Sequence, residues 1–96
     1  MTGEGPQKIG TVLRELIDSM GMRHKIDAAR VVESWAMIAG PEINAYTNRA
    51  WLERRILIVQ ITSAARRHDL HMNRTHWKNR LNAELGTDLI DEIQFR

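Results

Sequence analysis

The stretch Trp51–Leu85, WLERRILIVQITSAARRHDLHMNRTHWKNRLNAEL, joins a short aliphatic run to the longest helical pattern in the chain. Its run Ile56–Ile61 is nearly all aliphatic and rich in β-branched residues, which is typical of a central strand covered on both faces. Thr62 or Ser63 can cap the helix that follows, and Gly86 is placed to end it. We therefore expect a strand-to-helix unit against which the other elements pack.

A second strand is predicted immediately before this unit. Residues 45–52 include Tyr46 and Trp51, and the polar triplet Glu53–Arg55 separates them from the aliphatic run. This pattern predicts two strands joined by a short turn. Asn48 and Arg49 interrupt the alternation of the first strand, so we expect that strand to be irregular.

Two helices are predicted upstream of the hairpin. An apolar stripe at helical spacing consists of Ile9, Val12, Leu13, Leu16, Ile17 and Met20. Gly21 is placed to end this first helix, and such a stripe is far more often core than a docking surface for a partner. Asp27 can cap a second helix that carries Trp35 as a core anchor. Gly40-Pro41 is expected to end it, with a short helical turn afterwards.

The last residues complete a small mixed fold. Ile93 and Phe95 alternate with Gln94 and Arg96, as in a half-buried strand. The predicted order is α, α, short α, β, β, α, β. This order indicates an α+β protein with a three-stranded sheet and helices packed on one face. With 96 residues and 43% hydrophobic content, we expect one domain at residues 9–96 behind a disordered tail at 1–8.

The composition excludes several kinds of site and segment. Cysteine is absent, so neither disulfides nor thiolate metal sites are available. No signal peptide is recognisable and no apolar segment approaches the length of a membrane span, so we expect an intracellular, soluble protein without a membrane partner. The net charge is only +2, but arginine dominates the 14 basic residues, which favours planar contacts to phosphates, carboxylates or bases.

No pattern of catalytic residues is found. A P-loop, a glycine-rich dinucleotide turn and a G-x-S-x-G elbow are all missing from the sequence. His68 and His71 have the spacing of two ligands to one ion, but His76 lies on a different side of the predicted helix. We therefore expect no enzyme activity, no cofactor, no small-molecule substrate and no metal site.

The basic and aromatic side chains near the strand-to-helix unit are candidates for contact with a partner. Arg54 and Arg55 lie at the predicted hairpin tip, either solvated or facing a phosphate. On one continuous helix Arg74 falls within the packing face and Arg67 at its edge. Each is therefore expected to snorkel to the surface, to pair with a carboxylate inside the protein, or to meet a ligand. The candidate contact residues are Arg54, Arg55, Arg66, Arg67, Arg74, Lys78, Trp51 and Tyr46. The two aromatic residues are candidates for stacking on bases.

Several motifs together resemble the DciA family over nearly the whole chain from Ile9. They are WAMIAG at 35–40, Thr47, L-x-V-x-I-T-S at 57–63, R-x-D-L at 67–70, LNAELG at 81–86 and I-x-F-R at 93–96. The resemblance implies a KH-like fold and a bacterial factor, cytoplasmic and nucleoid-associated, that helps to load or operate the replicative DnaB-type helicase. It also implies affinity for DNA in some members.

One feature departs from the KH pattern. KH domains that bind nucleic acid clamp its backbone with a GXXG loop between helices, whereas the comparable loop here reads Gly40-Pro41-Glu42-Ile43. KH-style RNA binding is therefore not expected. Two hypotheses stay open: an adaptor that docks on the helicase, or a stand-alone KH-like module that binds single-stranded or structured DNA, or RNA.

Overall fold

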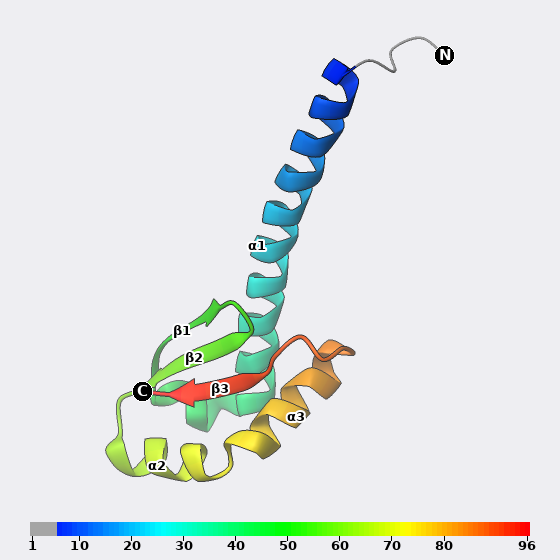
Figure 1. Ribbon diagram of the computed structural model, residues 1–96. Helices are drawn as coiled ribbons and strands as arrows, with labels where there is room; N and C mark the ends of the chain where they lie inside the picture. Colours follow the sequence, from blue (N-terminus) through cyan, green and yellow to red (C-terminus); the bar gives the residue numbers. More distant parts are fainter. Residues whose placement is uncertain (1–5) are drawn as a thin grey trace.

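Three helices and three strands make up the described part of the chain. The computed structural model describes the backbone of residues 6–96 and the side chains of Leu16 and residues 21–96. In chain order (Figure 1) the elements are α1 (Pro6–Ala45), β1 (Thr47–Glu53), β2 (Ile56–Ile61), α2 (Ala64–Met72), α3 (Arg74–Leu85) and β3 (Glu92–Phe95). The predicted α+β class, with helices packed on a three-stranded sheet, is confirmed. Of the predicted tail, residues 1–5 lie outside the described part and residues 6–8 belong to α1.

The sheet has the strand order β1-β2-β3, with β2 in the centre. β1 runs antiparallel to β2, whereas β3 runs parallel to it. The expected irregularity of β1 is present as a register shift between Thr47 and Arg49. In β2, Leu57, Ile58 and Val59 are at most 1% exposed, which confirms a central strand covered on both faces. This topology is compatible with the KH-like fold that the resemblance implies.

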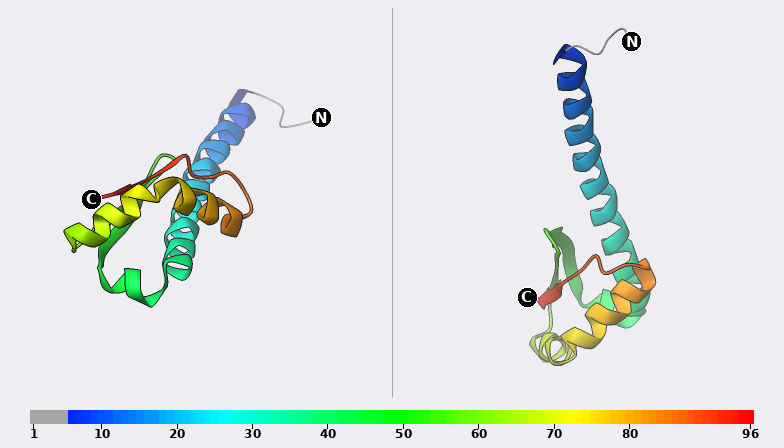
Figure 2. Two further views of the ribbon diagram at one scale, coloured as in Figure 1. Left: turned by 90° about the horizontal axis from the view of Figure 1, so that it is seen from below. Right: turned by 45° about the vertical axis from the view of Figure 1, so that its right-hand side comes forward.

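The core lies between the sheet and the helices, which are on the same side of the sheet in Figure 2. Trp35 is 1% exposed, and its ring centroid lies 5.3 Å from that of Trp77 and 5.7 Å from that of Phe95. Its buried indole N–H has no acceptor among the described residues, so Trp35 is held by apolar and aromatic packing. The prediction that Trp35 anchors the core is confirmed.

α1 is one long helix where two were predicted. Its backbone stays helical through Gly21, and Asp27 lies inside the helix, so neither residue has the terminating or capping role that we expected. A glycine in a helix costs only about 1 kcal/mol relative to alanine, which does not end a helix by itself. Gly40 does interrupt it, with φ 80° and ψ 173°, and Pro41 begins the predicted short turn.

The N-terminal half of α1 extends away from the sheet (Figure 1). The core receives side chains from α1 only from Val31 onward, among the described residues. Leu16 is 55% exposed, so the expectation that the first apolar stripe is core is wrong at this position, because the unbroken helix carries it past the sheet. The other stripe side chains lie outside the described ones. In the portion of the chain that the structure describes, no helix is sufficiently long and apolar to span a bilayer.

The predicted helix after β2 is divided in two at Asn73. The backbone there has φ −109° and ψ 19°, and its N–H donates to the carbonyl of Leu70 at 3.1 Å. The Asn73 amide also donates to the carbonyl of Asp69 at 2.9 Å, and such local side-chain bonds compete with helix propagation. Ser63 caps α2 and Gly86, with φ 76°, ends α3, as predicted.

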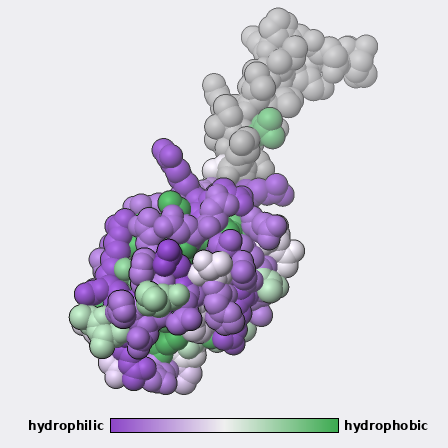
Figure 3. Space-filling model, turned by 60° about the horizontal axis from the view of Figure 1, so that its bottom comes forward, coloured by the Kyte–Doolittle hydropathy of each residue, from purple (hydrophilic) through white to green (hydrophobic). Residues whose placement is uncertain are grey.

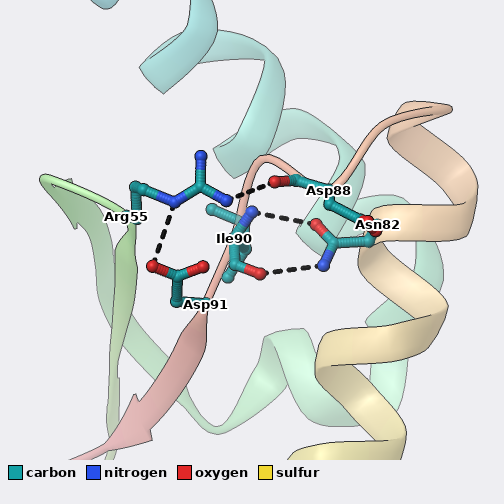
Figure 4. A network of polar contacts seen from close by, with 5 residues as sticks. All are labelled: Arg55, Asn82, Asp88, Ile90 and Asp91. Carbon is teal, nitrogen blue, oxygen red and sulfur yellow. Dashed lines mark hydrogen bonds and ion pairs between the residues drawn. The ribbon is translucent and has the colours of Figure 1, made fainter.

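Asn82 joins α3 to the segment before β3 (Figure 4). Its side-chain amide donates to the carbonyl of Ile90 at 2.8 Å, and its oxygen accepts from the Ile90 N–H at 2.9 Å. Asn82 is 8% exposed and Ile90 2%, so all four polar groups are paired away from water. This clamp sets the position from which the chain enters β3.

We predict that Asn82→Ala destabilises the protein by about 2–4 kcal/mol, because both backbone groups of Ile90 are left buried without a partner. Urea unfolding followed by circular dichroism measures the loss. Asn79→Ala is the matched control, because Asn79 is exposed on the same helix, and it should change stability by less than about 0.5 kcal/mol. Equal effects of the two substitutions would contradict the assigned role of the clamp.

Candidate functional site

The eight candidate contact residues lie in four separate places. Arg54 and Arg55 form the hairpin turn, and Trp51 lies on the sheet. Tyr46 and Arg66 contact each other at a cavity between the helices. The remaining three, Arg67, Arg74 and Lys78, line hollows beside β3. They therefore do not form one continuous basic surface.

At the hairpin turn, the two arginines differ in their surroundings. Arg54 is exposed and has φ 56°, a left-handed conformation suited to a tight turn. Arg55 forms an ion pair with Asp91, with Nε 3.0 Å from Oδ2, and its Nη2 donates to the carbonyl of Asp88 (Figure 4). Arg55 is therefore tied to the loop before β3, whereas Arg54 faces solvent.

The Arg55–Asp91 pair shifts the ionisation of both groups. The hydrogen bond from Arg55, together with its positive charge, lowers the pKa of Asp91, and Lys78 adds a smaller effect in the same direction. The same hydrogen bond and the charge of Asp91 raise the pKa of Arg55. Each charge is thus partly neutralised by its neighbour before any ligand arrives.

Tyr46 and Arg66 line a cavity of about 210 Å³. The guanidinium carbon of Arg66 lies 4.9 Å from the centre of the Tyr46 ring, and Arg66 also pairs with Glu42, which raises the pKa of the guanidinium. The cavity is lined mainly by apolar groups, from Ile43, Tyr46, Arg66, Asp69, Leu70, Asn73 and Trp77. Space of this size accepts one large side chain.

The face seen in Figure 3 is mostly hydrophilic, with small separate hydrophobic areas.

Two shallow hollows beside β3, which we call the β3 groove, collect the other basic residues. The first is lined by Ala64, Arg67, His68, His71 and Phe95. The second is lined by Arg74, Thr75, Lys78, Asp91, Glu92 and Ile93. One lining residue of each contacts the other, because Nη1 of Arg74 lies 3.3 Å from Nε2 of His71. The β3 groove is thus basic along most of its length and acidic at the Asp91 end.

Arg67 and Arg74 form no ion pair with a described side chain. Nη1 of Arg67 donates to the carbonyl of Ile61 at 3.2 Å, and the residue is half-buried. Nη1 of Arg74 donates to the carbonyl of His71 at 3.0 Å. This carbonyl lies in the last turn of α2, where backbone carbonyls lack a partner within the helix. Arg74 is exposed, so its predicted place within the packing face is wrong, because the break at Asn73 resets the helical phase.

The helix junction at Asn73 is also the place to look for a KH-type loop. Gly40-Pro41-Glu42-Ile43, which we compared with a GXXG loop, is a kink and turn inside α1. The junction between the two consecutive helices, α2 and α3, is at Asn73 and has no glycine beside it. A backbone clamp of the GXXG kind is therefore missing from both positions.

Trp51 lies on the sheet face opposite the core. It is half-buried, and its indole N–H donates to Oε1 of Glu53 at 3.2 Å. The guanidinium carbon of Arg49 lies 4.7 Å from the centre of its ring. Arg49 was not among the predicted contacts, although its i, i+2 spacing from Trp51 in a strand indicates that both lie on the same face.

Metal binding has no support from the described residues. Among them, no three His, Asp or Glu side chains lie close enough together to hold one ion. His68 and His71 line the same hollow, but His76 lies 6.0 Å from Trp77, ring centre to ring centre, on α3. His68 and His71 thus lie in the first hollow beside β3, and His76 lies beside Trp77 on α3.

Comparison with protein families identifies the chain. The family model described as "Dna[CI] antecedent, DciA" matches residues 8–95 of the 96. The chain belongs to the DciA family. It matches no curated protein and no solved structure. Membership confirms the resemblance carried by the sequence motifs.

The DciA family places the protein in DNA replication. It is a non-enzymatic family related to loaders of the replicative helicase, and membership implies an interaction with a replicative helicase in general.

We predict that Asp91→Asn lowers the melting temperature near neutral pH and that the difference from wild type disappears in acid. The folded-state pKa of Asp91 lies below its ordinary value of 3.8, so the stabilisation is present above that value and is lost as the pH falls through the folded-state pKa. The effect is small, because the two side chains are 51% and 65% exposed. Thermal unfolding between neutral pH and acid measures it.

Glu84→Gln, on α3, is the control for removing one carboxylate. A difference between Asp91→Asn and wild type that persists unchanged into acid would contradict this assignment.

Proposed function

We propose that this protein is a cytoplasmic, nucleoid-associated bacterial adaptor that binds the replicative DnaB-type helicase and assists its loading or activity without being an enzyme. The observation that carries the proposal is the match of the DciA family model to residues 8–95. The folded body is small and has no GXXG clamp, so a protein-docking role suits it better than KH-style nucleic-acid binding.

The distribution of charge supports the adaptor over a protein that chiefly binds DNA. The candidate cations lie in three separate places, and Arg55 and Arg66 already pair with Asp91 and Glu42. A tight DNA-binding surface requires several cations that act on adjacent phosphates. Binding of single-stranded or structured DNA is therefore proposed as secondary to the helicase interaction.

The β3 groove is the proposed site of that secondary binding. Arg67, Arg74 and Lys78 lie along it, and none of them forms an ion pair with a described side chain. Phosphates of a single strand would lie against these cations, with Lys78 bordering the acidic end at Asp91 and Glu92. Tyr46 and Arg66, at the separate cavity, are proposed as partner contacts.

Co-purification with the cognate helicase tests the adaptor function. The tagged chain is mixed with the purified DnaB-type helicase at low and at high salt, and unwinding by the helicase is measured with and without it. We expect a complex that survives the high-salt wash and faster loading or unwinding. Lack of both co-purification and stimulation would remove the adaptor hypothesis, whatever the chain does with DNA.

We predict that the double substitution Arg74→Gln, Lys78→Gln weakens binding to a labelled single-stranded oligonucleotide. Each lost phosphate contact also makes the dependence of log affinity on log salt concentration shallower by about 0.7. Fluorescence anisotropy at several salt concentrations measures both quantities.

The matched control is Arg23→Gln, Lys25→Gln, which removes the same charges from exposed positions on α1. If the control lowered affinity as much as the groove variant, binding would depend on net charge alone.

A further inference from the structure

The sheet face opposite the core, which we call the open face, carries three rows of side chains set by the strand register. The middle row is Trp51, Ile58 and Gln94. The row toward the C-terminal end of β2 is Arg49, Gln60 and Arg96. The row at the hairpin end is Glu53, Ile56 and Glu92. Charge therefore changes sign along the face, from arginine through aromatic and amide groups to carboxylate.

An aromatic and cationic stack occupies the middle of the open face. Ile58 is 1% exposed yet stands outside the core cluster, so its neighbours on this face cover it. Trp51 is half-buried, and Arg49 stacks on its ring at 4.7 Å. α1, α2 and α3 all pack on the other face of the sheet (Figures 1 and 2), so no described helix packs on the open face.

The side chains of the row at the Arg49 end are cations and an amide, and none of them is a carboxylate. Nη2 of Arg96 donates to Oε1 of Gln94 at 2.9 Å, and the Asn48 amide donates to Oε1 of Gln60 at 3.2 Å. Neither Arg49 nor Arg96 forms an ion pair with a described side chain. Each of these hydrogen bonds is exposed, so water or a ligand can replace it at little cost.

We propose that the open face binds single-stranded nucleic acid, with a base stacked on the Trp51–Arg49 pair and phosphates at Arg49 and Arg96. Aromatic rings and guanidinium planes both stack on bases, and amides form hydrogen bonds with base edges. Glu53 and Glu92 repel phosphates from the hairpin end, so the strand crosses the sheet at the arginine end. This proposal rests on the nucleic-acid part of the proposed function and is independent of the helicase part.

The open face lies next to the β3 groove. Arg67, in the groove, donates to the carbonyl of Ile61, and the Ile61 N–H donates to the carbonyl of Arg96 at 2.7 Å. The end of the arginine row and the end of the groove therefore meet where β2 and β3 finish. A nucleic-acid strand bound on the open face can continue past Arg67 into the β3 groove. The open face and the groove are then two consecutive parts of one binding path.

Anisotropy titrations of the full chain with labelled oligo(dT) at low salt test the proposal. Trp51→Leu keeps an apolar cover over Ile58 but removes the ring, and we expect about 10-fold weaker binding. Trp51→Phe should retain most of the affinity. Arg96→Gln should weaken binding and make the salt dependence shallower by about 0.7.

Arg80→Gln is the matched control, because Arg80 also stacks on a tryptophan, at 5.4 Å from the centre of the Trp77 ring, but on α3. It should bind as wild type does. A melting temperature of Trp51→Leu close to that of wild type shows that the fold is intact.

Three results would overturn the proposal, and each says something different about the protein. If only Arg74→Gln, Lys78→Gln weakens binding, the groove alone holds DNA and the proposed function stands. If Trp51→Leu loses the helicase but keeps the oligonucleotide, the open face is a protein interface. If wild type does not bind oligo(dT) at low salt, the nucleic-acid part fails altogether, and helicase co-purification still decides the adaptor function.

Discussion

The parallel pairing of β2 with β3 is the constraint on which the rest of the structure depends. Parallel neighbours cannot be joined by a tight turn, so the chain between Ile61 and Glu92 has to cross over. α2 and α3 form this crossover and cover one face of the sheet, with Leu70 and Leu81 buried against it. Asn82 then holds the returning chain at Ile90, where both backbone groups need partners.

That constraint also explains where the possible binding surfaces lie. Because the crossover packs on one face of the sheet, no described helix covers the other face. The side chains of Trp51 and Arg49 stack on each other there. The division of the crossover at Asn73 brings α2 and α3 beside β3 and creates the groove that holds Arg67 and Arg74. Both surfaces are consequences of how the chain returns to the sheet.

Several cations have structural roles that reduce their availability to a partner. Arg55 ties the hairpin to the loop before β3, Arg66 pairs with Glu42, and Arg67 satisfies the carbonyl at the end of β2. Such contacts lower the gain from adding a phosphate, because the existing partner has to be replaced or shared. In a protein with a net charge of only +2, this favours a role in which protein contacts dominate and DNA contacts assist.

The sequence by itself determined the strands, the buried anchors and the family. The aliphatic run of β2 and the alternation of Ile93 with Phe95 are local patterns that need no knowledge of the partner strands. Trp35 was predictable as core because its helical spacing places it among aliphatic residues. Gly86 and Ser63 were predictable because caps depend on the nearest residues.

Only the tertiary structure decided where the helices stop and which cations share a surface. Gly21 is tolerated inside α1, whereas Asn73 interrupts the later helix. Whether such a residue ends a helix depends on small differences in free energy between local propensity and packing. The position of Arg74 follows from that interruption, since its direction depends on the phase of a helix that begins beside it. Arg67 and Arg96 are linked only through the backbone of Ile61, which depends on strand register and crossover packing. Whether the stacked pair of Arg49 and Trp51 is covered depends on which face of the sheet the crossover helices occupy.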